Sequence, residues 1–268
     1  RAGIGALLRA ALPEVLSESQ LTKLMDQLLG ATGAEIAKLV RDARTFAISA
    51  QEVLSADHVS QAADLLHPPP SVDLIWRIAV HEAGHLLAAH LLGLPPAQSA
   101  SIGAKGGNVL HPSTVYLTPA TLHARVCTSL AGRAAEQLIM DDISCGAGVS
   151  YGSDLSMATT LSLRAEAALG FGKSLSWYAP ETPLSLLPSE IQERVEARLQ
   201  QAQTEVTDLL RDHRGTLEHI ARELAEKREM DQPELTRLIA EAVRGAGLSG
   251  RNPDPGRRIK PTPNLSDD

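Results

Sequence analysis

The first 66 residues contain short runs of apolar side chains at helical spacing, separated by residues that interrupt helices. We predict helices over residues 2–11, 19–29, 34–50 and 56–66, with breaks near Pro13, Gly30 and Ser55. Residues 67–70 read His-Pro-Pro-Pro, which favours a stiff, extended spacer. The pattern therefore indicates a small four-helix unit at 1–66 and a proline linker at 67–70.

Residues 71–93 form the most apolar stretch of the chain. Ser71 or Asp73 can cap a helix here, no proline interrupts it, and Gly93 followed by two prolines ends it. Apolar residues occur on nearly every side of this predicted helix, and a helix of that kind is buried.

The rest of the chain is mainly helical in pattern. Strand character is confined to residues 97–118, where we expect a small β-hairpin or three-stranded sheet, with residues 114–117 as one alternating strand. Helices are predicted over 121–141, from 154 onward, over 189–225 (as one helix or two) and over 231–246. Residues 249–268 contain four prolines and few apolar residues, so we predict a disordered tail. The predicted class is mainly α with a small β element.

Within the buried helix stands the sequence His81-Glu82-Ala83-Gly84-His85. Side chains at positions i and i+4 share one helix face, about 5–6 Å apart at Cβ, so the two imidazoles can bind one Zn²⁺. Glu82 lies beside them and can act as a base toward water. The competing interpretation is a pair of core histidines with ordinary hydrogen bonds, but burial of three polar side chains in one turn favours a metal. Gly84 would allow close approach at the site.

A catalytic zinc needs a third protein ligand. The downstream candidates are His111, His123, Glu136, Asp141, Asp142 and Asp154. Glu136 lies on an apolar helix and could face the metal. Asp154 lies where a glycine-rich loop becomes a helix, although Ser153 or Asp154 could serve there only as an N-cap. Spacing alone does not choose between Glu136 and Asp154.

Composition narrows the possible functions. Of 268 residues, 43% are hydrophobic and only 3% aromatic, which favours an aliphatic, alanine-rich helical core. The net charge of −7 argues against a nucleic-acid partner. Two cysteines do not make a disulfide framework. No apolar run reaches the roughly 18 residues of a membrane span, and no signal peptide is visible.

Several segments together resemble the FtsH family of ATP-dependent zinc metalloproteases. They are HEAGH at 81–85, AGRAAEQLI at 131–139, GSDLSMATTLS at 152–162, GATGAEIAKLVRDARTFA at 30–47 and LEHIARELAEKREMDQPEL at 217–235. Their ordered combination is far more specific than H-E-x-x-H alone. The resemblance covers nearly all of residues 1–246.

The resemblance implies a zinc endopeptidase domain at 71–248 that cleaves unfolded or loosely folded proteins. It implies His81, His85 and Asp154 as zinc ligands, Glu82 as the catalytic base, and Glu136 as a residue that supports the site. The loop before Asp154 is longer and richer in glycine than is usual in the family.

The resemblance further identifies residues 1–66 as the helical lid of an AAA+ ATPase module. The chain lacks the phosphate loop G-x-x-x-x-G-K-[ST], so we expect an ATP-binding core before Arg1 in a longer protein. A hexameric ring is implied, with protein substrates and no nucleic acid. A cytoplasmic location is implied too, and any tether to the cytoplasmic face of a membrane would lie in other segments.

Two rival hypotheses differ in class. The chain could be a non-catalytic ring-assembly or scaffold module with a degenerate site, although it keeps His81, Glu82, His85 and Asp154. It could also hold a structural zinc that Cys145 closes as a fourth ligand, since structural zinc sites are usually fully protein-ligated.

Overall fold

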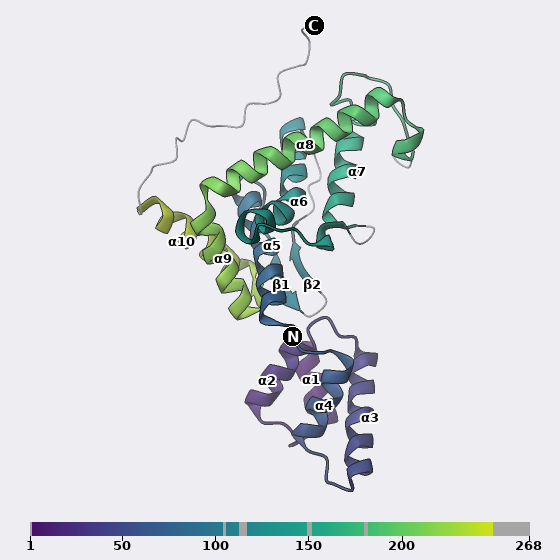
Figure 1. Cartoon of the computed structure of the whole chain (residues 1–268), viewed down its shortest axis with the longest axis vertical. Helices are drawn as coiled ribbons and strands as arrows, with labels where there is room; N and C mark the ends of the chain where they lie inside the picture. Colours follow the sequence, from purple (N-terminus) through teal and green to yellow (C-terminus); the bar gives the residue numbers. More distant parts are fainter. Residues whose placement is uncertain (1, 104–105, 113–116, 149–151, 180–181, 249–268) are drawn as a thin grey trace.

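The computed structural model describes residues 2–103, 106–112, 117–148, 152–179 and 182–248 (Figure 1). The predicted disordered tail at 249–268 lies outside these residues. So does most of the strand predicted at 114–117.

The first 66 residues form four helices around a hydrophobic core of their own. Their bounds are α1 Ala2–Ala11, α2 Glu18–Gln27, α3 Gly33–Ala50 and α4 Ala56–Leu66. Ser17 and Thr32 start α2 and α3 with capping boxes, in which the cap and the residue three positions later satisfy each other's backbone groups. Leu8, Leu28 and Leu39 are fully buried between the helices. The four predicted helices are thus confirmed, and Figure 1 shows them gathered at one end of the molecule.

The second core is built around α5 (Val72–Leu91), which Ser71 caps through a hydrogen bond to the Leu74 amide. Twelve of its twenty residues are buried, as the apolar pattern predicts. Helix α6 (Pro119–Met140) packs directly against it. The packing is close because a Cβ atom on Gly84 would lie 2.5 Å from the Ala131 carbonyl oxygen of α6. The close approach expected at Gly84 is therefore an approach of helix to helix.

The remaining helices enclose this pair. They are α7 Asp154–Ala167, α8 Ser189–Asp212, α9 Arg214–Lys227 and α10 Gln232–Leu248, with short 3₁₀ turns at Cys145–Gly148 and Leu184–Leu186. The segment predicted as one helix or two over 189–225 is two helices that meet at His213. Helix α8 is the longest and crosses both α6 and α7 (Figure 1).

A three-stranded antiparallel sheet lies beside α5. Strands β1 (Ser99–Gly103) and β2 (Gly106–Leu110) form the predicted hairpin, with Ser99 opposite Leu110. The third strand is β3 (Glu229–Asp231), between α9 and α10, and the order is β2-β1-β3. Strand β2 therefore lies at an edge of the sheet. The third strand lies far along the chain from residues 97–118, where the sequence pattern suggested strands. It was not predicted there because a three-residue strand is too short to show alternation.

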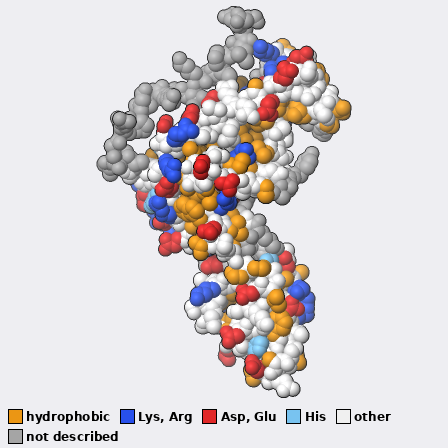
Figure 2. Space-filling model, in the orientation of Figure 1, with side chains coloured by type: hydrophobic (Ala, Val, Ile, Leu, Met, Phe, Trp, Pro, Cys, Tyr) orange, Lys and Arg blue, Asp and Glu red, His pale blue; other side chains and the backbone are white. Residues whose placement is uncertain are grey.

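Acidic and basic side chains are interspersed over the face drawn in Figure 2. Among the helices of the described ranges, none has the length and apolar character needed to cross a membrane.

Candidate metal centre

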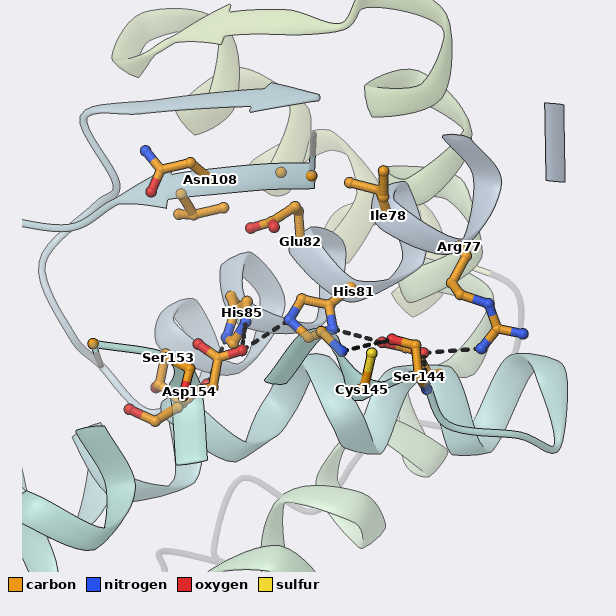
Figure 3. A pocket seen from close by; sticks show the side chains of 18 of the residues that line it. Arg77, Ile78, His81, Glu82, His85, Asn108, Ser144, Cys145, Ser153 and Asp154 are labelled. Atoms are coloured by element: carbon orange, nitrogen blue, oxygen red, sulfur yellow. Dashed lines mark hydrogen bonds and ion pairs between the residues drawn. The ribbon is translucent and has the colours of Figure 1, made fainter. Parts of the chain in front are cut away.

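A cavity of about 760 Å³ opens between α5, β2 and the start of α7 (Figure 3). Its lining combines polar side chains with the glycine-rich backbone of β2, and it includes His81, Glu82, His85, Gly107 and Asp154. The H-E-x-x-H sequence and both candidate carboxylates, Glu136 and Asp154, therefore line a common space.

Three of the predicted ligand atoms converge in this cavity. The Asp154 Oδ2 atom lies 2.9 Å from His81 Nε2 and 3.3 Å from His85 Nε2. One ligand atom from each of the three residues lies within 4.8 Å of the others. Around a tetrahedral zinc ion, bonds of about 2.0–2.1 Å would place nitrogen and oxygen ligands about 3.3 Å apart. The donor set and its spacing therefore fit Zn²⁺.

Two local features of the chain bring these atoms together. One turn of α5 separates the histidines, so their rings stack edge-on with centroids 4.8 Å apart. Asp154 is the first residue of α7, and Ser153 occupies the N-cap position without a side-chain cap bond. The Asp154 carboxylate points toward the histidines instead of capping its own helix (Figure 3).

The other ring nitrogen of each histidine contacts an acceptor. His85 Nδ1 donates to the backbone carbonyl of Thr128 at 2.7 Å, and His81 Nδ1 donates to Glu136 Oε1 at 2.7 Å. Because these oxygens only accept, Nδ1 carries the proton in both rings. The Nε2 atoms, which contact Asp154 Oδ2 in this structure, are then the nitrogens that a metal would bind. Acceptors at the other ring nitrogen commonly orient metal-bound histidines in this way.

Glu136 is therefore a supporting residue in this geometry, on the far side of His81 from Asp154. It is buried, and it also accepts hydrogen bonds from Arg77 Nη1 at 3.0 Å and from the Ser144 amide at 2.8 Å. Burial alone would raise the pKa of its carboxyl, but the donors, His81 foremost, outweigh burial and lower that pKa to about 2. Glu136 is thus held as a carboxylate.

Glu82 lies at the floor of the cavity and is 6% exposed. Burial raises the pKa of its carboxyl, against the opposing influence of His85 and His81. Its side chain lies against the backbone of β2, where a Cβ atom on Gly107 would collide with the carboxylate. A buried carboxylate with a raised pKa is a good proton acceptor near neutral pH.

The remaining candidates lie elsewhere or play other parts. His111 lines the cavity, and burial lowers its pKa to about 4, but it is not in the convergent cluster. Asp141 ends α6 in a left-handed conformation, and Asp142 pairs with Arg77 at 3.2 Å. His123 belongs to a different cluster, with Cys127 of α6 and Glu205 of α8. Cys145 lines the cavity, yet the convergent set contains only His81, His85 and Asp154.

Sequence reasoning missed several supporting groups. Gly132 leaves the room that the His81 ring occupies, because a Cβ atom there would collide with the imidazole. The Thr128 carbonyl, Arg77 and Ser144 also went unrecognised. A glycine in the middle of an apolar helix is a signal that could have pointed to Gly132, whereas a backbone carbonyl leaves no trace in the sequence.

The chain is similar to known proteins over most of its length. A model of peptidase family M41 matches residues 76–238. The ATP-dependent zinc metalloprotease FtsH 2 of Sphaerobacter thermophilus is 31% identical over 242 residues, covering 82% of this chain and 36% of that protein. The ATP-dependent zinc metalloprotease FtsH of Methylibium petroleiphilum is 29% identical over 281 residues, covering 92% of this chain and 45% of that protein.

A further relative is the ATP-dependent zinc metalloprotease FtsH of Mycobacterium tuberculosis, 26% identical over 87% of this chain. The chain spans between about a third and a half of the length of these curated relatives. The family model covers more than half of the chain, including every residue of the convergent cluster. The chain therefore belongs to peptidase family M41, the FtsH-type zinc metalloproteases.

Proposed function

We propose that this chain is a zinc-dependent endopeptidase in which His81, His85 and Asp154 hold the metal and Glu82 is the catalytic base. The observation that carries the proposal is the convergence of three ligand atoms within 4.8 Å, next to a buried glutamate in one open cavity. A scaffold module would have no need of this arrangement.

When bound, zinc would act as a Lewis acid toward the scissile carbonyl and toward water. Side chains and one backbone carbonyl of the protein would transfer the proton and orient the imidazole rings. Glu82 takes a proton from the attacking water on its carboxylate and passes it to the leaving amine nitrogen. Glu136 and the Thr128 carbonyl hold the two imidazole rings in the tautomer that presents Nε2.

The edge strand offers a way to bind substrate. Gly106, Gly107, Asn108 and Val109 of β2 line the cavity, and most of the strand is exposed. An extended peptide could add to this edge through main-chain hydrogen bonds, which are indifferent to side chains. We therefore propose unfolded or loosely folded proteins as substrates.

The longer protein is also part of the proposal. The relatives are named ATP-dependent, and the four-helix unit has a core separate from that of the metal centre. We propose that residues 1–66 are the lid of an AAA+ module, that 71–248 are the peptidase domain, and that the full-length protein assembles as a hexamer and feeds substrates to the site with ATP.

The test is the substitution Glu82→Gln. The variant should contain as much zinc as the wild-type protein. Its cleavage of casein should fall by roughly 10²–10⁴-fold, the usual contribution of a general base. The control is Asp73→Asn, which changes an exposed acid on the same helix and should cleave normally. Normal cleavage by the Glu82→Gln variant would contradict the proposed role of Glu82 as the base. A wild-type protein that contains no zinc would favour the scaffold hypothesis.

A further inference from the structure

A second cluster of metal-binding side chains lies between α6 and α8, apart from the cavity of the metal centre. His123 and Cys127 are four residues apart on α6, and Glu205 reaches them from α8. One ligand atom from each lies within 4.8 Å of the other two. In the described part of the chain, only this group and the His81 cluster have that property.

The distances resemble those of a metal site. Cys127 Sγ lies 3.6 Å from His123 Nε2. Zinc bonds of about 2.0–2.1 Å to nitrogen and about 2.3 Å to sulfur place tetrahedral nitrogen and sulfur ligands about 3.6 Å apart. Glu205 Oε2 lies 2.7 Å from His123 Nε2, a short imidazole–carboxylate approach like the 2.9 Å between His81 and Asp154.

We propose that His123, Cys127 and Glu205 form a second binding site for a divalent transition-metal ion, with zinc as the preferred occupant. Imidazole nitrogen, cysteine sulfur and carboxylate oxygen are the three donor types that zinc uses in proteins. As the ion binds, the Cys127 S–H bond breaks, a metal–sulfur bond forms and the proton passes to solvent. Thiolate and carboxylate together balance the two positive charges of the ion.

The surroundings suit a site that a metal can reach from solvent. The side chains of His123 and Glu205 are 18% and 28% exposed, while Cys127 is buried below them. Gln201 donates to the other Glu205 oxygen at 2.7 Å and so holds the carboxylate in place. A water molecule would be the fourth ligand, as in other zinc sites with three protein ligands.

A metal ion at this site would link two helices of the peptidase domain. Two ligands come from α6 and one from α8, so an ion bound here would tie these helices together. Cys127 also immediately precedes Thr128, whose carbonyl holds His85. A metal on Cys127 would therefore brace the part of α6 that orients a ligand of the first centre.

Cobalt(II) distinguishes the two sites by their chemistry. The first cluster contains no sulfur, so a thiolate-to-cobalt charge-transfer absorption in the near ultraviolet can arise only where cobalt binds a cysteine. We expect this absorption when the full chain is titrated with Co²⁺. Cys127→Ala should abolish it, and Cys145→Ser should retain it, because these are the only two cysteines in the chain.

A stoichiometry measurement completes the test. Metal analysis after equilibration with Zn²⁺ should find two ions per wild-type chain and one in Glu205→Gln, which keeps the size of a partly exposed side chain and so preserves the fold. A wild-type protein that binds one zinc and shows no thiolate absorption with Co²⁺ would overturn the proposal, leaving only a His123–Glu205 hydrogen bond. A Cys145→Ser variant that loses the absorption would overturn it as well.

Discussion

Glu136→Gln tests how the protein orients His81, one of the proposed metal ligands. In the native structure Glu136 Oε1 faces His81 Nδ1 and the Ser144 hydroxyl, and Oε2 faces Arg77 Nη1 and the Ser144 amide. All four partners donate to the carboxylate. Glutamine has nearly the same shape but replaces one acceptor oxygen with an NH₂ group, which only donates.

The arrangement of donors decides which way the amide turns. With NH₂ in place of Oε2, it would face Arg77 and the Ser144 amide, neither of which can accept. With NH₂ in place of Oε1, it would face a hydroxyl that can rotate and an imidazole that can accept by moving its proton from Nδ1 to Nε2. The second arrangement is less costly, and it blocks the His81 nitrogen that would face the metal.

Zinc affinity should therefore fall by about 10–100-fold, as is typical when a supporting group is lost. This corresponds to roughly 1.4–2.8 kcal/mol. The measurement is a competition titration against a chromophoric chelator at fixed pH. Asp142→Asn is the matched control, because Asp142 also pairs with Arg77 but is exposed and does not contact a histidine. Wild-type affinity in a natively folded Glu136→Gln protein would refute the reasoning.

The same substitution should change stability in acid. The pKa of Glu136 is about 2 in the folded protein, below its ordinary value of 4.5. The stability it contributes is complete above about pH 4.5 and is lost as the pH falls toward 2. Glu136→Gln should therefore flatten this part of a denaturant-midpoint profile measured against pH. An unchanged slope between pH 4.5 and 2 would show that Glu136 is not linked to folding in this way.

Three further predictions concern other contacts. Gly132→Ala should push the His81 ring aside and weaken zinc binding, which the same chelator titration would detect; unaltered binding would mean that α6 yields instead. Glu166→Ala should lower the free energy of unfolding in urea by about 3 kcal/mol, because it removes the buried partner of Arg194 and Arg198. A decrease of less than about 1 kcal/mol would contradict this prediction. In the native metal-free protein, iodoacetamide should modify Cys145 but not Cys127. Burial, with a smaller contribution from Glu205, raises the pKa of the Cys127 thiol to about 12, and the neutral thiol is a poor nucleophile. Equal labelling of the two cysteines in mass spectrometry would refute this prediction.

The sequence predicted the helices well because their signals are local. Ser71 caps the helix that its position indicates, and α5 is buried as its apolar surface requires. The third strand could not be predicted, since residues 229–231 become a strand only by pairing with β1. Pairing of this kind depends on tertiary contacts that a short segment does not encode.

The geometry of the candidate metal centre was predictable only in part. The spacing of His81 and His85 follows from helix geometry alone. Sequence spacing could not choose between Glu136 and Asp154, and both carboxylates contact His81, at opposite nitrogens of its ring. Asp154 also approaches His85, at 3.3 Å. That approach depends on how α5, α6 and α7 pack, which is not a property of any one segment.

The separation of the candidate ligands along the chain has a consequence for folding kinetics. His81 and Asp154 are 73 positions apart, and the carboxylate reaches the imidazole only after α5, α6 and α7 have docked. We therefore expect the complete ligand set to form late in folding, after most of the loop-closure entropy has been lost. Added zinc should therefore leave the refolding rate nearly unchanged and lower the unfolding rate, so that the metal-loaded protein unfolds more slowly than the metal-free protein.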